Sequence, residues 1–439
     1  MRSLSRFSFL RWLAVGMHVK RWLLLVLLGV TLMGLGFGYV LREVYFSYTF
    51  PDWVAYATLQ FLPRLVRAAL FMFVACSVIL FAVWKLNTSL LAAFIKPSND
   101  DSILDTIYRY RYQARGPKVV AIGGGTGLPV LLRGLKEHTS NLTAIVTVGD
   151  DGGSSGRLRR ELGVLPPGDL RNCIAALAEA EPLMTRLFQY RFNEGSNLAG
   201  HSFGNLFLVA MSGITGNFEE AVRETSRVLA VRGLILPSTL AHVTVHARTE
   251  DGHEISGESN ITMEGTRIEE VFLQPANVQA NPETIRAILE ADLVVVGPGS
   301  LLTSVLPNLL VDGIRQALAI SQATKIYVCN VATQHGETDD FSVSDHFDTL
   351  VRHVGPGLFD YVLANDNVAG PLPEAWRSEP VRIDLPVVDG ARVITADVVS
   401  EKNRYHHESS KLAGAIMRIY SGRNQYEAAE ELAAARAAR

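Results

Sequence analysis

The sequence predicts an α/β fold, a Rossmann-like and mostly parallel sheet with helices on both faces and a small β insertion, preceded by two transmembrane helices. Three observations predict it. Short apolar runs alternate with helical patterns from Lys118 onward, which is typical of a parallel sheet. Glycine-rich turns follow several of these runs. Two long apolar stretches come before them.

Composition limits the classes of function. The chain has 439 residues, which allows two or three domains at about 150 residues each. A net charge of −3 offers no basic excess to neutralise phosphates, so no nucleic-acid partner is expected. Cys76, Cys173 and Cys329 lie far apart without C-x-x-C spacing. They indicate free thiols in a reducing compartment, and neither a disulfide framework nor a zinc site.

Residues 1–96 are predicted to be a membrane anchor. Residues 22–41 carry no charge and are long enough to cross a bilayer core of about 30 Å as a helix. A second apolar stretch begins at residue 68, and the second transmembrane helix is expected at about 68–90. A cleaved signal peptide and two buried soluble helices are the alternatives. The first is disfavoured by the length of residues 22–41, and the second by the lack of charge.

The distribution of basic residues predicts the orientation of this anchor. Basic residues are frequent before the first stretch and after the second, and sparse between the two. The positive-inside rule therefore places both termini and the following domain in the cytoplasm of a multi-pass cell-membrane protein. Gly34 and Gly38 share one face of the first helix. That face is expected to pack against the second helix, and a homo-oligomer is the alternative.

Residues 97–117 form a predicted polar, basic link, residues 118–425 a nucleotide-binding α/β domain, and residues 426–439 a helical tail. Strands are expected at residues 119–122, 143–148, 293–296, 326–329 and 361–364. Helices are expected at residues 128–137, 170–179, 218–231, 282–290 and 310–319. Antiparallel strands at residues 241–247 and 271–273 are the expected β insertion.

Glycines dominate the turn after the first expected strand, which consists of Gly123, Gly124, Gly125, Thr126 and Gly127. Such a turn lets the backbone approach a ligand and aims helix N–H groups at it, which suits a phosphate. Val130 occupies the place of the third glycine in G-x-G-x-x-G, so the dinucleotide signature is incomplete.

Acidic and hydroxyl side chains follow the next expected strand. The candidate site residues of this turn are Asp150, Asp151, Gly153, Ser154, Ser155 and Arg157. A doubly wound fold commonly places an acid here, near a ribose or a metal. The carboxylates are expected to bind sugar hydroxyls, and a Mg²⁺ ion is the alternative. Ser154, Ser155 and Arg157 would offset the charge of a diphosphate.

Four further groups of polar residues lie at expected strand ends or helix starts. Asp169 is a predicted helix N-cap, and with Arg171 and Asn172 it suits a phosphate, metal or sugar-hydroxyl site as well as capping alone. His201 and Asn205 begin an apolar helix, where His201 is either a structural residue or a base. The other two groups are Gly297, Gly299, Ser300, Thr303 and Ser304, a candidate anion pocket, and Asn330, Thr333 and Gln334, candidate base or sugar ligands.

Six ordered blocks together resemble the gluconeogenesis factor family. They are residues 123–127, 150–157, 166–172, 200–205, 297–304 and 327–334. That family belongs to the superfamily of 2-phospho-L-lactate transferase, an enzyme of deazaflavin cofactor assembly. The resemblance covers about residues 118–420, and the apolar N-terminal segment falls outside the family's usual compact form.

The resemblance implies a nucleotide-binding regulator that takes a UDP-sugar, such as UDP-N-acetylglucosamine. It implies roles in cell shape and envelope synthesis on gluconeogenic carbon sources, with unidentified envelope-synthesis proteins as partners. In the transferase branch, a matching aspartate helps hold the deazaflavin and magnesium assists phosphoryl chemistry. Asp169 is the matching position, whereas Arg171 and Asn172 follow the factor branch. A Mg²⁺-dependent phosphotransferase is therefore the alternative, with Asp169 as its catalytic residue.

Overall fold

A computed structural model describes residues 19–48, 51–59, 61–94, 113–179, 182–193, 198–265, 267–368, 372 and 377–437. The chain divides into two compact units, Met1–Arg109 and Tyr110–Arg439, and each is described by itself. The predicted link at residues 97–117 lies outside the described residues as far as residue 112.

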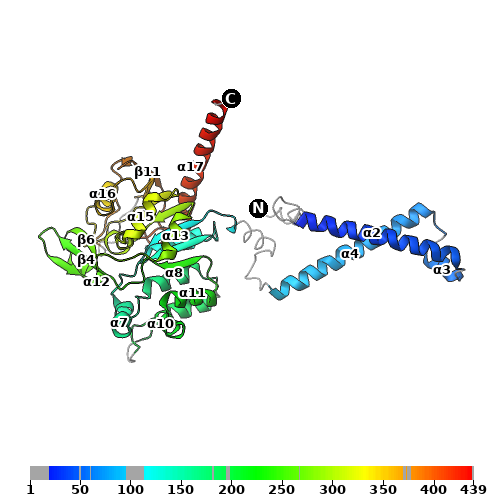
Figure 1. The fold of residues 1–439 in the computed structure, drawn as a ribbon, viewed down its shortest axis with the longest axis horizontal. Coiled ribbons are helices and arrows are strands. Elements are labelled where there is room, and N and C mark those ends of the chain that lie inside the picture. Colours follow the sequence, from blue (N-terminus) through cyan, green and yellow to red (C-terminus); the bar gives the residue numbers. More distant parts are fainter. Residues whose placement is uncertain are drawn as a thin grey trace. The chain divides into compact units, whose positions relative to one another are not determined.

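The first unit is helical. It contains α2 (Val19–Ser47), α3 (Asp52–Ala57) and α4 (Arg64–Phe94) (Figure 1). Within the described residues, one helical stretch is long and apolar enough to cross a membrane, Arg64–Phe81 in α4. The prediction of two transmembrane helices is thus not confirmed, although α2 is helical throughout residues 22–41. Apolar side chains described in both long helices, such as Met33 and Phe73, are exposed.

The expected packing of the glycine face of α2 against the second helix is not seen among the described residues. A Cβ added at Gly34, Gly36 or Gly38 would meet no atom of the described part of the chain within 4 Å. Glycine favours close helix approach only where a partner is present. The face stays open in the described structure.

The second unit is built on an eight-stranded sheet with the order β10-β11-β9-β8-β7-β1-β2-β3. All pairs are parallel except β10–β11. Its strands are β1 (Val119–Gly123), β2 (Leu142–Val146), β3 (Leu234–Pro237), β7 (Leu293–Val296), β8 (Thr324–Val328), β9 (Tyr361–Asn365), β10 (Val387–Val388) and β11 (Ala391–Ala396). The mostly parallel sheet confirms the α/β part of the predicted fold class.

Alternation along β1 divides the apolar core into two layers. Val119 and Ala121 belong to one buried cluster, whereas Val120 and Ile122 belong to the other, because neighbouring strand residues point to opposite faces. The first layer is covered by α6 (Gly127–Leu135), α8 (Gly168–Leu177), α9 (Pro182–Gln189), α10 (Phe203–Thr215), α11 (Phe218–Val228) and α17 (Ser409–Ala437). The second is covered by α13 (Pro282–Leu289), η2 (Leu301–Val305), α14 (Leu306–Leu309), α15 (Asp312–Ile320) and α16 (Val343–Val354). Helices therefore cover both faces, as predicted.

The predicted β insertion is a separate antiparallel sheet with the order β5-β4-β6. It consists of β4 (Thr244–Thr249), β5 (Glu254–Ser256) and β6 (Ile268–Gln274), with α12 (Glu258–Glu264) between the last two. Val245, Ala247 and Val271 of this sheet are buried in the second layer. The insertion is thus packed against the domain and also brings α12 to it.

Several elements of the structure were not among those predicted. The expected central strands are present, but β3, β10, β11, β5, α7 (Gly153–Leu162), α9, α12 and α16 were not predicted. The tail is continuous with α17, whose early residues Leu412 and Ile416 are buried. The missed strands β3, β5 and β10 span only two to four residues, too few to show a periodicity.

Candidate functional site

Loops that follow β1, β2, β7 and β8 leave the large sheet at one edge, which we call the carboxyl edge. These four strands are neighbours and parallel, so their loops must meet there. The opposite edge, where the same strands begin, is called the amino edge. Every predicted site residue of the turns after β1, β2, β7 and β8 lies at the carboxyl edge.

The glycine turn after β1 packs tightly against two neighbouring loops. Gly125 has a φ of +59°, a conformation that favours glycine. A Cβ added at Gly124 would lie 2.4 Å from Thr147 Cγ2, and one at Gly127 would lie 2.3 Å from the carbonyl oxygen of Pro298. Gly123 ends β1, and Thr126 is the N-cap residue of α6. The glycines therefore allow parts of this chain to approach one another.

The carboxylate of Asp169 lies beside the glycine turn, in the place where the sequence predicted a bound phosphate. Its Oδ2 accepts a hydrogen bond from the Gly125 N–H over 2.7 Å. Helix α8 has Pro167 as its N-cap, so the prediction that Asp169 caps the helix is wrong. Burial, followed by the charge of Asp150, raises the pKa of Asp169 to about 6, although the Gly125 N–H and Arg171 act in the opposite direction. Asp169 is thus an internal acceptor for the glycine turn.

Ser154, His201 and Asn205 form a buried hydrogen-bond network. Ser154 Oγ lies 3.0 Å from His201 Nδ1 and accepts a hydrogen bond from Asn205 Nδ2 over 3.0 Å. Burial, followed by the charge of Arg157, lowers the pKa of His201. Ser202, the N-cap of α10, accepts hydrogen bonds from the Asn205 N–H and from Arg171 Nη1. His201 therefore has a structural partner and, when neutral, keeps one nitrogen as an acceptor.

The remaining predicted residues around α7 and α8 also contact protein groups. Arg157 donates to the carbonyl oxygen of Ala199 over 2.7 Å, and Asn172 Oδ1 accepts from Arg171 Nη2 over 2.7 Å. Gly153 begins α7, and Ser155 hydrogen-bonds to Asp150. These contacts hold α7, α8 and the start of α10 together around the carboxyl edge.

Two carboxyl groups that sequence reasoning did not select join this site, Glu258 in the first turn of α12 and Glu337 after β8. Burial is the largest cause that raises the pKa values of Glu258, Glu337 and Asp150. The charges of Asp169 and Asp150 raise the pKa of Glu258 further. Each of these two acids directly follows a glycine, which is too weak a sequence signal to select it.

Glu337 organises the loops after β7 and β8. Its carboxylate accepts hydrogen bonds from Thr262 Oγ1 over 3.0 Å and from Gln334 Nε2 over 2.8 Å. Ser300 Oγ also donates to Glu337, and Thr303 Oγ1 lies at 3.5 Å. Three predicted ligand-binding side chains, Ser300, Thr303 and Gln334, therefore face a buried carboxylate of the protein.

The loops after β7 and β8 are also tied by their backbones. Gly299 N–H donates to Asn330 Oδ1 over 3.2 Å, and Gly297 and Gly299 have positive φ angles. Thr333 Oγ1 accepts from the Glu379 N–H over 2.9 Å. Ser304 reaches the glycine turn, since a Cβ added at Gly125 would lie 3.1 Å from its Oγ. The predicted residues are brought together, but most of them already have a partner.

A small polar pocket lies between these loops. It is lined by Thr126, Gly127, Gly299, Ser300, Asn330 and Gln334, which were predicted, and by Tyr405, His406 and His407, which were not. His407 Nε2 donates to the carbonyl oxygen of Cys329 over 3.3 Å, and burial lowers the pKa of His407 to about 4. The segment that carries these residues lies far along the chain and contains no glycine turn, so it gave no motif.

No group of three or more His, Cys, Asp or Glu side chains within the described ranges is arranged to hold a metal ion. Asp151 Oδ1 accepts from the Ser259 N–H over 3.0 Å, and Asp169 is held by Gly125. Mg²⁺ usually takes one or two carboxylates together with water and substrate phosphates. An ion at this edge would therefore need oxygens from a ligand.

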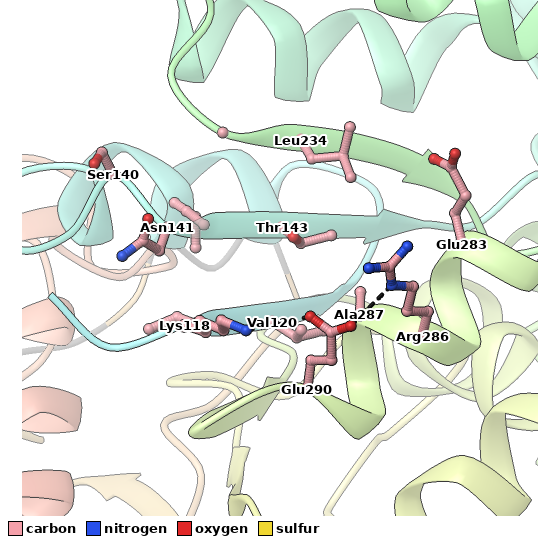
Figure 2. Close-up of a pocket in the computed structure, with 13 residues that line it drawn as sticks. Lys118, Val120, Ser140, Asn141, Thr143, Leu234, Glu283, Arg286, Ala287 and Glu290 are labelled. Carbon is pink, nitrogen blue, oxygen red and sulfur yellow. Dashed lines mark hydrogen bonds and ion pairs between the residues drawn. The ribbon is translucent and has the colours of Figure 1, made fainter. Parts of the chain in front are cut away.

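A larger cavity of about 430 Å³ lies at the amino edge (Figure 2). Three of its charged residues are paired with one another: Arg286 Nε donates to Glu290 over 2.8 Å, and Lys118 Nζ donates to the same carboxylate over 3.2 Å. The fourth, Glu283, pairs with Arg223 outside the cavity. The cavity is also lined by the buried residue Val120 and by the exposed residue Leu234 of the outer strand β3. No predicted site residue lines this cavity, so size alone does not make it the candidate site.

The described geometry can be compared with known proteins. Residues 119–399 match the family model described as 2-phospho-L-lactate transferase CofD. A gluconeogenesis factor from Bacillus subtilis (strain 168) is 49% identical over 308 residues, which are 69% of this chain and 97% of that protein. A gluconeogenesis factor homologue from Nostoc sp. (strain PCC 7120) is 44% identical over 432 residues, 94% of this chain and 93% of its own length. The second match is too long to be confined to Tyr110–Arg439.

A solved structure gives the same result. The crystal structure of a Bacillus halodurans protein is 46% identical, with a TM-score of 0.66, and the match covers 69% of this chain and 100% of that one. The family model and the relatives agree on the same α/β region. The chain belongs to the 2-phospho-L-lactate transferase CofD family and is a relative of the gluconeogenesis factors.

Proposed function

We propose that this protein is a regulator that binds a UDP-sugar, such as UDP-N-acetylglucosamine, at the carboxyl edge. In this role it supports cell shape and envelope synthesis during growth on gluconeogenic carbon sources. The observation that carries the proposal is the meeting of the loops after β1, β7 and β8 with Tyr405–His407 around one polar pocket. Ligands of open α/β sheets bind outside the carboxyl ends of the strands.

The chemistry of the edge suits the two parts of such a ligand. Asn330, His406 and the turn around Gly127 line the pocket and supply donors and acceptors for a nucleotide. Asp150 and Asp169 supply carboxylate acceptors, which suit hydroxyl groups rather than phosphates. The proposal is that the diphosphate lies beside Thr126 and Gly127, which line the pocket, and the sugar lies near the acids.

The first unit would hold the protein in the cell membrane as a multi-pass anchor, with the α/β unit in the cytoplasm. The exposed apolar side chains of α2 and α4 support this, as does the single candidate span Arg64–Phe81. The full chain is expected in the membrane fraction after an alkaline wash. Recovery of a soluble full chain would contradict anchoring. Deletion of residues 1–96 should also weaken complementation of cell shape on a gluconeogenic carbon source.

A phosphotransferase is the second candidate, favoured by the match to the CofD family model and by the buried carboxyl of Asp169. Asp169 would then hold or move a proton at Oδ2, next to Gly125. A Mg²⁺ ion brought with the ligand would offset phosphate charge. In that case Asp169→Asn should abolish turnover while binding survives.

One experiment separates these two functions. The full chain, purified in detergent, is titrated with UDP-N-acetylglucosamine by calorimetry, with and without Mg²⁺, and the nucleotide is then recovered and analysed by chromatography. A regulator should bind saturably and return the ligand unchanged. Conversion of the ligand would favour the transferase, and absence of binding would contradict a UDP-sugar regulator.

A further inference from the structure

Helix α12 of the β insertion is fixed against the carboxyl edge at two points. The Ser259 N–H at its start donates to Asp151 Oδ1 over 3.0 Å, and Thr262 Oγ1 donates to Glu337 over 3.0 Å. Gly257 permits this approach, because a Cβ there would lie only 2.0 Å from Asp151 Oδ2. The insertion is therefore connected to the loops after both β2 and β8.

Next to the first of these points is Glu258, the first residue of α12, whose Oε2 is fully buried and has no hydrogen-bond partner. Other buried polar atoms also lack a partner, among them Arg171 Nε and Asn205 Oδ1 at this edge, on side chains that are 7% and 1% exposed. Buried polar atoms are nearly always hydrogen-bonded, and an unpaired one is costly. Three of them in one region indicate a place where a polar ligand completes the structure.

The surroundings of Glu258 decide which ligand group fits. Its carboxyl interacts electrostatically most with Asp169, followed by Asp150 and Glu337, so the space that it faces is acidic. A phosphate would be repelled there, and it carries no donor at neutral pH. A sugar hydroxyl is uncharged, donates to a carboxylate and accepts from a group such as Arg171 Nε.

We propose that Glu258 is a ligand-binding residue that accepts a hydrogen bond from a sugar hydroxyl of the bound nucleotide sugar. The β insertion thereby forms one wall of the site. This inference rests on the proposed UDP-sugar binding and deepens it. The hydroxyl belongs either to the hexose or to the ribose, which share this chemistry.

The test compares three variants of the full chain in detergent: Glu258→Ala, Glu258→Gln and the matched control Glu264→Gln, which lies exposed at the end of the same helix. Each is titrated by calorimetry with UDP-N-acetylglucosamine and with UDP. Loss of a hydrogen bond to this buried carboxyl group should weaken binding by about tenfold in Glu258→Ala. Glu258→Gln should lose less, because its amide oxygen still accepts a hydrogen bond.

The two ligands identify the hydroxyl. A loss confined to UDP-N-acetylglucosamine assigns the contact to the hexose, and an equal loss for UDP assigns it to the ribose. If Glu258→Ala and Glu258→Gln, both folded by circular dichroism, bind like Glu264→Gln, the inference is overturned while the proposed function stands. If the wild-type chain binds neither ligand, the proposed function fails and this inference with it.

Discussion

The two edges of the large sheet differ in how their polar groups are satisfied. At the amino edge, a cavity of about 430 Å³ is bordered by Lys118, Arg286 and Glu290, which pair with one another near the surface. At the carboxyl edge the pocket is smaller, but buried acids interact with one another and Glu258 Oε2 has no partner. Volume therefore does not locate the site. The buried acids locate the site, because ionisable groups with strongly shifted pKa values cluster at functional sites.

The first prediction separates the two edges by their effect on ligand affinity. His406→Ala removes a pocket-lining side chain at the carboxyl edge and should weaken UDP-N-acetylglucosamine binding by about tenfold. Its matched control, Arg286→Ala at the amino edge, should bind like the wild type. Calorimetry of both variants checks this. The reverse pattern, a loss only in Arg286→Ala, would place the site in the cavity of Figure 2.

The next effect concerns stability at the carboxyl edge. Gly127→Ala would force a Cβ to within 2.3 Å of the Pro298 carbonyl oxygen, whereas Gly213→Ala on α10 meets no atom within 4 Å. We expect Gly127→Ala to lower the unfolding free energy by about 2 kcal/mol, and Gly213→Ala to leave it equal or slightly higher. Denaturant titrations followed by circular dichroism measure both. Equal stability of the two variants would show that the loops are not tightly packed.

A smaller effect depends on pH. The pKa of Asp169, about 6, lies above its ordinary value, so the folded state holds the proton more tightly than the unfolded state. Its contribution to stability is therefore present below about pH 4 and is lost as the pH rises towards 6. Asp169→Asn should raise the unfolding free energy at pH 7.5 by about 1–2 kcal/mol and leave it nearly unchanged at pH 4. A constant difference between variant and wild type at both pH values would exclude this titration.

The smallest effect is expected at the amino edge. Arg286→Ala breaks an exposed ion pair with Glu290, and such pairs are weakened by solvent and salt. The midpoint of denaturation of Arg286→Ala should equal that of the wild type, both at low and at high salt. A lower midpoint for the variant at low salt, but not at high salt, would mean that this ion pair stabilises the amino edge.

Much of the fold and part of the site could be predicted from the sequence. The central strands β1, β2 and β7 are apolar runs followed by polar turns, and parallel pairing alone brings those turns together. The sequence could not place Glu258, because α12 reaches the edge only through tertiary contacts with Asp151 and Glu337. His406 comes from a segment without a motif. Nothing in the sequence indicated that the Gly125 N–H, expected to face a phosphate, donates to Asp169, which lies 44 residues away along the chain.

The central claim is that a nucleotide sugar binds at the carboxyl edge, and one measurement tests it most directly. The full chain and its His406→Ala variant are titrated with UDP-N-acetylglucosamine under identical conditions, and the recovered ligand is analysed. Our account predicts saturable binding to the wild type, affinity about tenfold weaker in the variant, and an unchanged ligand. Equal affinity of the two proteins, or no binding by either, would contradict it.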